Sequence, residues 1–260
     1  MTGNAFRSAL ESDTLQLGAG VVSCSPTIVE AYGRLGLDFV WLDLEHSGIS
    51  PTDSERLENL ARAADVSDTE LVVRVTSPAP HVVRKVLDAS VRNIVIPRVE
   101  TAAEVERAVA ASRFVHEGAP GERGAGLGRA NYWGEDVSAD YRRREDETAL
   151  VGVNIENHTA VSNLEDILAV PDLGFVLLGH QDLSVSMGAT PDDPEVQDAI
   201  ESYRETAAAS GVPFGRSVGV DADAIEAAVD AGYGMLLIGN EIAAARAVFG
   251  DRVGRFAESA

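Results

Sequence analysis

Short apolar runs alternate along this chain with segments whose apolar residues recur every three or four positions. Such spacing is typical of amphipathic helices, and in segment 101–114 it places Val105, Ala108 and Val109 on one face. Thr101 and Glu104 form a capping-box pattern that predicts the start of this helix. The apolar runs have the length of strands and occupy residues 18–24, 38–44, 71–76, 93–99, 150–156, 174–179, 213–218 and 235–239.

Eight strands, each followed by a helical segment, predict an α/β fold, a single (β/α)8 TIM barrel over residues 1–260. An open doubly wound sheet is the competitor, but it would more often carry a glycine-rich first turn, which residues 23–27 lack. Segment 116–147 interrupts the alternation, and we expect a long βα-type loop insertion there. It could be a flexible surface excursion, an active-site loop or a subunit contact.

Composition narrows the cellular setting. The chain has no apolar run of about 18 residues, and its first residues lack the basic-then-apolar layout of a signal peptide. A single cysteine, Cys24, excludes an internal disulfide. These features predict a cytoplasmic protein without a membrane partner.

The charge is strongly acidic, with a formal net charge of −21 and Lys85 as the only lysine among 21 basic residues. Such a surface repels nucleic acid and anionic lipid. Because the acidic residues are spread through the helices, we interpret the charge as adaptation to a salty, halophilic cytoplasm. Screening over roughly 3 Å at molar salt would relieve the self-repulsion.

Polar residues gather at the carboxyl ends of the expected strands and are fewer at the amino ends. In a barrel the carboxyl ends carry the chemistry, so this asymmetry predicts a catalytic rim. The residues concerned are Asp43, Glu45, His46, Arg74, Arg98, Glu100, Asn154, Glu156, His158, His180, Gln181, Asp182, Arg216 and Ser217.

Glu156 and Asp182 are the best candidates for metal ligands. Each follows a strongly apolar strand, and neighbouring strands would bring the two carboxylates close enough to repel unless a cation lies between them. Oxygen ligands suit Mg²⁺ or Mn²⁺, with Co²⁺ as a further candidate. The alternative is that each carboxylate only caps the helix that follows.

His46 could be a base, a ligand or a packing residue, and Asp43 three positions earlier favours a base with a fixed tautomer. Arg74 lies inside an apolar run, so its guanidinium needs an anion: a substrate carboxylate, an enolate, or Asp43 or Asp88. Lys85 lies in a helical pattern, which makes a Schiff-base lyase very improbable.

Together these residues resemble the HpcH/HpaI aldolases, a family of metal-dependent class II enzymes that act on pyruvate-derived 2-keto acids. The resemblance covers roughly residues 15 to 250, in the family's order and spacing. Its blocks are Asp43-Leu44-Glu45-His46, Val73-Arg74-Val75, Leu87-Asp88-Ala89, residues 94–99, Gly121-Glu122-Arg123-Gly124 with Arg129-Ala130, Asn154-Ile155-Glu156, and residues 179–184 with Met187-Gly188.

The resemblance implies a TIM barrel whose C-terminal helix is exchanged between subunits of a homotrimer or homohexamer. It implies that Glu156 and Asp182 hold the divalent ion and that Arg74 steadies the enolate. His46 would be the acid/base group, acting through a bound water. Asp43 and Asp88 would orient His46, with Asp88 able to come from a neighbouring subunit.

For substrate binding, the resemblance implies that backbone amides near Gln181 and Asp182 receive the pyruvate carboxylate and that the Arg123 loop is an active-site or interface element. Several positions depart from the family pattern. The usual Leu-Asp-x-Gly reads Leu87-Asp88-Ala89-Ser90. Asn154 replaces the usual Gln, and Gly179-His180 replaces the usual Gly-Pro. These departures concern substrate identity more than reaction class, and Glu45 has no assigned role.

The favoured function is therefore a carbon–carbon lyase: a class II aldolase that cleaves a 4-hydroxy-2-keto acid, such as a 2-keto-3-deoxy sugar acid, reversibly to pyruvate and an aldehyde. One alternative is a citrate-lyase-like acyl-CoA lyase, which would want a basic groove that this acidic chain does not offer. The other is a non-catalytic barrel that binds a keto acid or a metal, against which the intact candidate residues argue.

Overall fold

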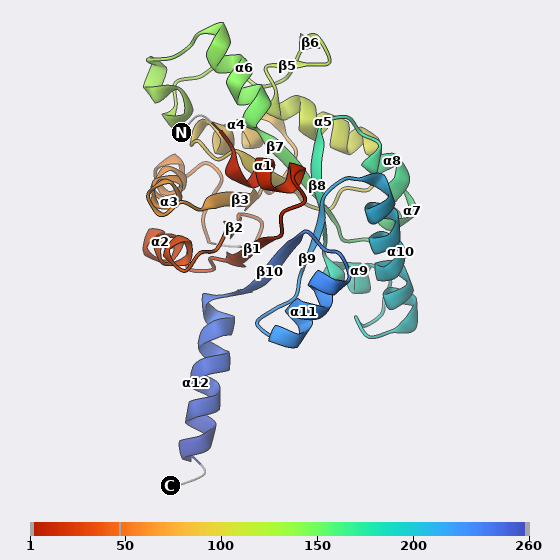
Figure 1. Cartoon of the computed structure of the whole chain (residues 1–260). Coiled ribbons are helices and arrows are strands. Elements are labelled where there is room, and N and C mark those ends of the chain that lie inside the picture. The colour runs from red at the N-terminus through yellow and green to blue at the C-terminus, as the bar shows by residue number, and fades with distance from the viewer. Residues whose placement is uncertain (1–2, 47, 258–260) are drawn as a thin grey trace.

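Eight parallel strands close into a barrel, with the helices outside it (Figure 1). The computed structural model describes residues 3–46 and 48–257. The barrel order is β1-β10-β9-β8-β7-β4-β3-β2, so the prediction of a (β/α)8 fold is confirmed. The strands are β1 (Gln16–Gly20), β2 (Phe39–Asp43), β3 (Glu70–Arg74), β4 (Asn93–Ile96), β7 (Leu150–Ile155), β8 (Leu173–Leu178), β9 (Phe214–Ser217) and β10 (Met235–Asn240).

The helices follow the strands as the apolar periodicity predicts. The backbone N–H of Thr101 donates to Glu104 Oε2 at 3.0 Å, which confirms the capping interaction at the start of α5. The helices are α1 (Ala5–Glu11), α2 (Pro26–Arg34), α3 (Ser54–Ser67), α4 (Pro80–Asp88), α5 (Ala102–Ser112), α6 (Ala139–Thr148), α7 (His158–Ser162), α8 (Leu164–Leu168), α9 (His180–Ser186), α10 (Pro194–Ser210), α11 (Ala222–Asp230) and α12 (Glu241–Ala257).

Helix α1 closes the amino end of the barrel. The Phe6 ring lies 5.2 Å from that of Phe39 and 5.7 Å from that of Phe175, both on barrel strands. Asn4, just before the helix, donates from Nδ2 to Asn93 Oδ1 at 2.6 Å. With its amino end filled by aromatic packing, the barrel offers its carboxyl end to ligands.

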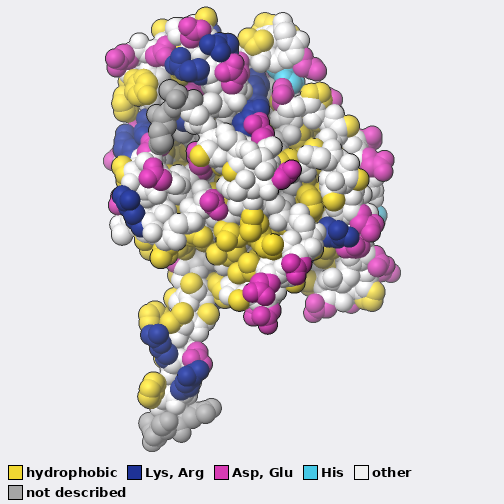
Figure 2. All heavy atoms as spheres, viewed as in Figure 1, with side chains coloured by type: hydrophobic (Ala, Val, Ile, Leu, Met, Phe, Trp, Pro, Cys, Tyr) yellow, Lys and Arg dark blue, Asp and Glu magenta, His cyan; other side chains and the backbone are white. Residues whose placement is uncertain are grey.

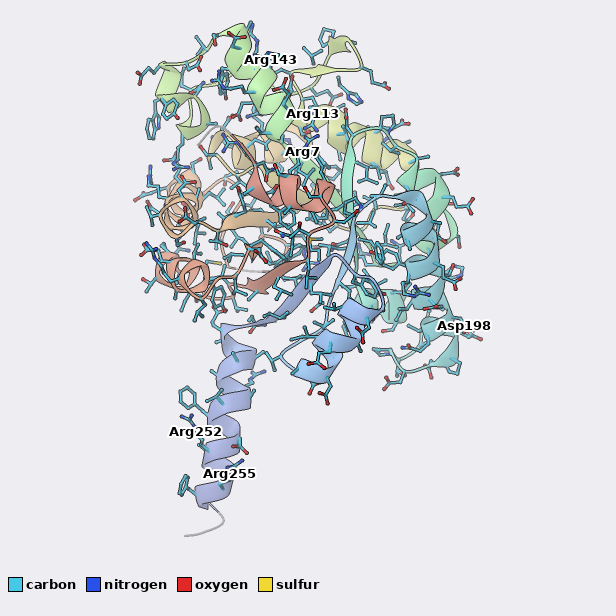
Figure 3. The ribbon with its side chains drawn as sticks, viewed as in Figure 1. Arg7, Arg113, Arg143, Asp198, Arg252 and Arg255 are labelled. Carbon is cyan, nitrogen blue, oxygen red and sulfur yellow. The ribbon has the colours of Figure 1, made fainter. Side chains whose placement is uncertain are left out.

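The 116–147 segment is a helix-to-strand connection between α5 and β7, and the expectation of a βα-type insertion is corrected. The two-stranded hairpin of β5 (Val115–His116) and β6 (Ala119–Pro120) begins it, and the 3-10 segment η1 (Arg129–Gly134) and most of α6 follow. A connection of this kind lies at the amino end of the barrel, near α1 (Figure 1). Arg7 on α1 (Figure 3) donates to the Glu147 carbonyl at 2.6 Å.

Helix α12 projects from the end of β10 away from the barrel (Figure 1). Hydrophobic side chains are exposed along it, and others gather on the body where it leaves (Figure 2). Arg252 and Arg255 extend from its outer half (Figure 3). Among the described residues, no helix is long and apolar enough to cross a membrane. The exposed apolar side chains of α12 are Ile242, Val248, Phe249, Val253 and Phe256.

Candidate active site

The register between β2 and β3 creates the central ion pair of the rim. Asp43 and Arg74 are direct neighbours across the two strands. Arg74 Nε donates to Asp43 Oδ1 at 3.0 Å, and Nη2 donates to Oδ2 at 2.6 Å. Burial alone would raise the pKa of Asp43, but the hydrogen bonds and charge of Arg74 hold it below its ordinary value. The Asp43 side chain is therefore an ionised carboxylate at neutral pH.

The same guanidinium also faces two further carboxylates. Arg74 Nη1 lies 3.3 Å from Glu45 Oε2 and 3.8 Å from Glu156 Oε2. Its charged group lies over the Trp41 ring, 5.8 Å from the centroid. One cation among three carboxylates leaves this part of the rim with excess negative charge. Sequence reasoning left Glu45 without a role, because it lies in the turn after β2, where strand alternation does not set the direction of a side chain.

Glu156 is buried directly after β7 and is held by two donors. Oε1 accepts from the backbone N–H of Arg98 at 2.6 Å, and Oε2 accepts from Asn154 Nδ2 at 3.0 Å. Arg98 has a φ of 56°, unusual for a residue other than glycine, and this turn directs its N–H at the carboxylate. Burial raises the pKa of Glu156 despite these bonds, and the charge of Asp182 adds to the increase.

Gly179 to Asp182 bring the start of α9 against Glu156. A Cβ on Gly179 would lie 2.6 Å from the Glu156 Cβ, so only glycine allows this approach. Gln181 Nε2 lies 3.3 Å from His180 Nε2, and burial lowers the pKa of His180, with the Arg216 charge contributing. A cavity of about 280 Å³ is lined by these four residues together with Trp41, Arg74, Asn154 and Glu156.

The donor set of this cavity fits a small divalent cation that retains water. Glu156 and Asp182 offer two carboxylates, and no group of three or more His, Cys, Asp or Glu that could hold a metal occurs among residues 3–46 and 48–257. Mg²⁺ and Mn²⁺ are often bound by one or two carboxylates plus water and substrate oxygens. Burial and the charge of Asp182 both raise the pKa of Glu156, and a cation between the two carboxylates would favour their charged forms.

His46 lies at the outer edge of this region. Its side chain is 66% exposed, and Nε2 lies 3.8 Å from Glu45 Oε2. Asp43 Oδ1 accepts from the backbone N–H groups of Glu45 at 2.9 Å and His46 at 3.3 Å. Asp43 thus fixes the backbone of the turn that carries His46, while the carboxylate beside the imidazole is Glu45.

The structure does not bring Asp88 and Arg123 to the cavity of their own chain. Arg123 is buried near the amino end, where Nη2 donates to Glu145 Oε2 at 2.8 Å and the guanidinium lies over Phe114 at 4.7 Å. Asp88 ends α4 against the backbone of Gly128. Burial raises the pKa of Asp88, and the charge of Arg123 partly opposes the increase.

A TIM barrel with a carboxylate-rich rim at its carboxyl end belongs to the large class of barrel proteins whose strand-end loops bind small molecules. The family model for HpcH/HpaI aldolase/citrate lyase matches residues 17–247. This chain therefore belongs to the HpcH/HpaI aldolase/citrate lyase family.

Two relatives are named as aldolases. A 5-keto-4-deoxy-D-glucarate aldolase of Klebsiella pneumoniae is 33% identical over 85% of this chain and 84% of its own. A hydroxypyruvate/pyruvate aldolase of Cupriavidus necator is 32% identical over 82% of this chain and 77% of its own. The crystal structure of a family protein from Burkholderia cenocepacia aligns with a TM-score of 0.89 at 27% identity, over 97% and 99% of the two chains. These relatives indicate a carbon–carbon lyase.

Proposed function

We propose that this protein is a class II aldolase that cleaves a 4-hydroxy-2-keto acid, such as a 2-keto-3-deoxy sugar acid, reversibly to pyruvate and an aldehyde. The observation that carries this proposal is the cavity at the carboxyl end of the barrel. It combines a buried carboxylate, Glu156, with Asp182 and with the Arg74 guanidinium. Names of relatives that act on keto acids support the substrate class.

The reaction needs a base, an anion-stabilising site and a proton donor. A base takes the proton of the C4 hydroxyl, the bond between C3 and C4 breaks, and its electron pair remains on pyruvate as the enolate. The enolate is then protonated at C3. His46 is our candidate for moving these protons, because it is exposed beside the rim and Glu45 can stabilise its imidazolium.

Arg74 is our candidate for stabilising the enolate oxygen. Its guanidinium is fixed by Asp43 and stacked on Trp41, so little reorganisation is needed when charge develops. A divalent cation, Mg²⁺ or Mn²⁺, held by Glu156 and Asp182 would supply Lewis-acid stabilisation of the same charge. Asn154 and Arg98 keep the Glu156 carboxylate in position. The substrate carboxylate would meet the first turn of α9, at Gly179, His180 and Gln181.

We further propose that the active form is a homo-oligomer, a trimer or hexamer, in which α12 is exchanged between subunits. The exposed apolar side chains of α12 support this, because they leave an uncovered surface that a second copy could bury (Figure 2). Asp88 and the loop around Arg123, remote from their own rim, would then serve a neighbouring subunit or the contact, while the Arg123 side chain itself stays buried against Glu145. The acidic surface and single cysteine support a halophilic, cytoplasmic setting.

Neither alternative function is favoured. An acyl-CoA lyase would need a cluster of basic groups near the cavity mouth, whereas Arg74 is outnumbered there by the carboxylates of Asp43 and Glu45. A non-catalytic binding protein has no need for the fixed pairing of Arg74 with Asp43 and Glu45.

The test is a retro-aldol assay with a panel of 2-keto-3-deoxy acids, measuring pyruvate release with Mg²⁺ or Mn²⁺ and with EDTA. We expect pyruvate from at least one substrate and its loss in EDTA. Deuterium exchange at C3 of pyruvate in D2O, followed by NMR, tests enolate formation without any aldehyde. Turnover that survives EDTA, or no exchange with any divalent ion, would contradict the proposal.

A further inference from the structure

A second cavity of about 630 Å³ adjoins the candidate active site. The two cavities share His180, Gln181 and Ser217 as lining residues, so they are neighbouring compartments of one region. The second lies between the end of β9 and the face of α11, where four alanines leave the space open. We call it the Arg216 cavity, after the charged side chain on its wall.

Arg216 has an unusual environment for a cation in this acidic chain. Its Nε is shielded from solvent and has no hydrogen-bond partner, and its guanidinium lies over the Tyr233 ring, 5.6 Å from the centroid. Within the described residues no carboxylate pairs with it, whereas Arg74 and Arg123 each have a close carboxylate. A partly buried guanidinium without an anion is costly, because its charge cannot be shed.

Arg216 lies next to the candidate active site. Arg216 is the register neighbour of Leu178, the last residue of β8, and the chain continues from Leu178 directly into Gly179 and the α9 turn. The Arg216 cavity therefore opens beside the α9 turn. A substrate whose keto-acid end lies at Glu156 and Asp182 could extend past His180 and Gln181 into it.

We propose that the Arg216 cavity receives the aldehyde half of the substrate and that Arg216 determines specificity by binding a terminal oxyanion, a carboxylate or a phosphate. This inference rests on the proposed aldolase function and narrows its substrate class. Arg216 lines this cavity, and a planar guanidinium can bind two oxygens of such a group through paired N–H groups, which a neutral hydroxyl or amide cannot match. Tyr233 orients the guanidinium by stacking.

The experiment compares matched aldehydes in the synthesis direction, with pyruvate and Mn²⁺. One pair is 4-oxobutanoate and its amide, 4-oxobutanamide; the other is glyceraldehyde 3-phosphate and glyceraldehyde. We expect the wild-type protein to favour the charged member of at least one pair in kcat/KM, and the preferred pair distinguishes carboxylate from phosphate. Arg216→Gln should reduce that ratio by about ten- to a hundredfold, and Arg216→Lys by less, because charge remains but the paired donors are lost.

Arg62→Gln is the matched control for net charge, since Arg62 pairs with Glu58 at 2.8 Å on α3, away from both cavities. It should keep the wild-type ratio. If the Arg216 variants fail to fold, the wild-type ratios still decide. Ratios near one for both pairs, with pyruvate exchange at C3 intact, overturn the assignment of Arg216 and leave the aldolase function standing. Absence of C3 exchange overturns both.

Discussion

The two ends of the barrel each hold a buried cluster of arginine and carboxylate, but the clusters differ in charge balance and in access. At the carboxyl end, one arginine, Arg74, faces Asp43, Glu45 and Glu156 beside an open cavity. At the amino end, one carboxylate, Glu145, is shared by Arg92 at 3.2 Å and Arg123 at 2.8 Å.

This difference separates a structural ion pair from a binding site better than burial does. Glu145 has two cations, so its charge is fully compensated by the protein itself. Glu156 has one distant arginine and a neighbouring carboxylate, and its pKa is raised by burial. We therefore expect Glu156, which lies next to a cavity and has no close cationic partner, to be the carboxylate that meets a ligand.

The largest expected effect is that of Glu156→Gln on activity. The amide keeps the shape but removes the charge, so we expect kcat/KM for pyruvate release to fall about 10²- to 10³-fold. The free energy of unfolding should change little, since removal of a buried charge offsets the loss of one of the two hydrogen bonds to the carboxylate. Activity is measured with the retro-aldol panel, and Mn²⁺ affinity by EPR. Wild-type affinity in the variant would contradict the assignment of Glu156 as a ligand.

A Glu→Gln substitution at the amino end of the barrel should have the opposite effects, lowering stability and leaving metal affinity unchanged. Glu145→Gln leaves the buried Arg123 without its carboxylate, so we expect a loss of about 3 kcal/mol in the free energy of unfolding. Mn²⁺ affinity should not change. Thermal denaturation gives the result, and Glu147→Gln, in the exposed pair of Glu147 with Arg143, is the control with little effect. Equal stability of the two variants would remove the distinction between the ends.

A smaller effect is expected for Arg74→Lys. Lysine keeps one positive charge but cannot donate to both oxygens of Asp43 while facing Glu45. We expect kcat to fall roughly 10- to 100-fold, with a smaller change in KM, in steady-state assays. Arg62→Lys, in an exposed helical pair, controls for the chemical change. An unchanged kcat would show that the guanidinium geometry is unimportant.

The smallest effect concerns acid stability. The pKa of Asp43 lies below its ordinary value in the folded protein, so its pairing stabilises the fold above that ordinary value. This contribution is lost as the pH falls through the folded-state pKa. Glu70, whose pKa is raised chiefly by burial, acts in the opposite direction. We expect Asp43→Asn to make unfolding less pH-dependent below pH ~4, with a slope change of at most one proton. A parallel pH profile would contradict this.

The barrel could be predicted from the sequence, because its strands are apolar on both faces and the apolar residues of its helices are periodic. The proximity of Glu156 and Asp182 could also be predicted, since both follow apolar runs, and both line one cavity. The pairing of Arg74 with Asp43 was only one of several options, because it depends on the register of β2 and β3. The donor from Arg98 could not be predicted, since it is a backbone N–H exposed by a positive φ.

The locations of Asp88 and Arg123 show a different limit. Their residue types fit a catalytic role, but the end of the barrel at which they lie depends on whether a connection follows a strand or a helix. The 116–147 segment follows α5, so Arg123 lies at the amino end. The spacing of motifs also cannot show whether a residue such as Asp88 would act in its own subunit or in a neighbouring one.

The docking of α1 has a consequence for the order of folding. Asn4 bonds to Asn93 and to the Thr148 carbonyl, 89 and 144 residues further along the chain. Until β4 and the start of β7 are in place, Asn4 lacks these two bonds, and contacts of such separation are slow to form. The docking of Asn4 is thus expected late in folding, which makes closure of the amino end a candidate for a slow step in refolding.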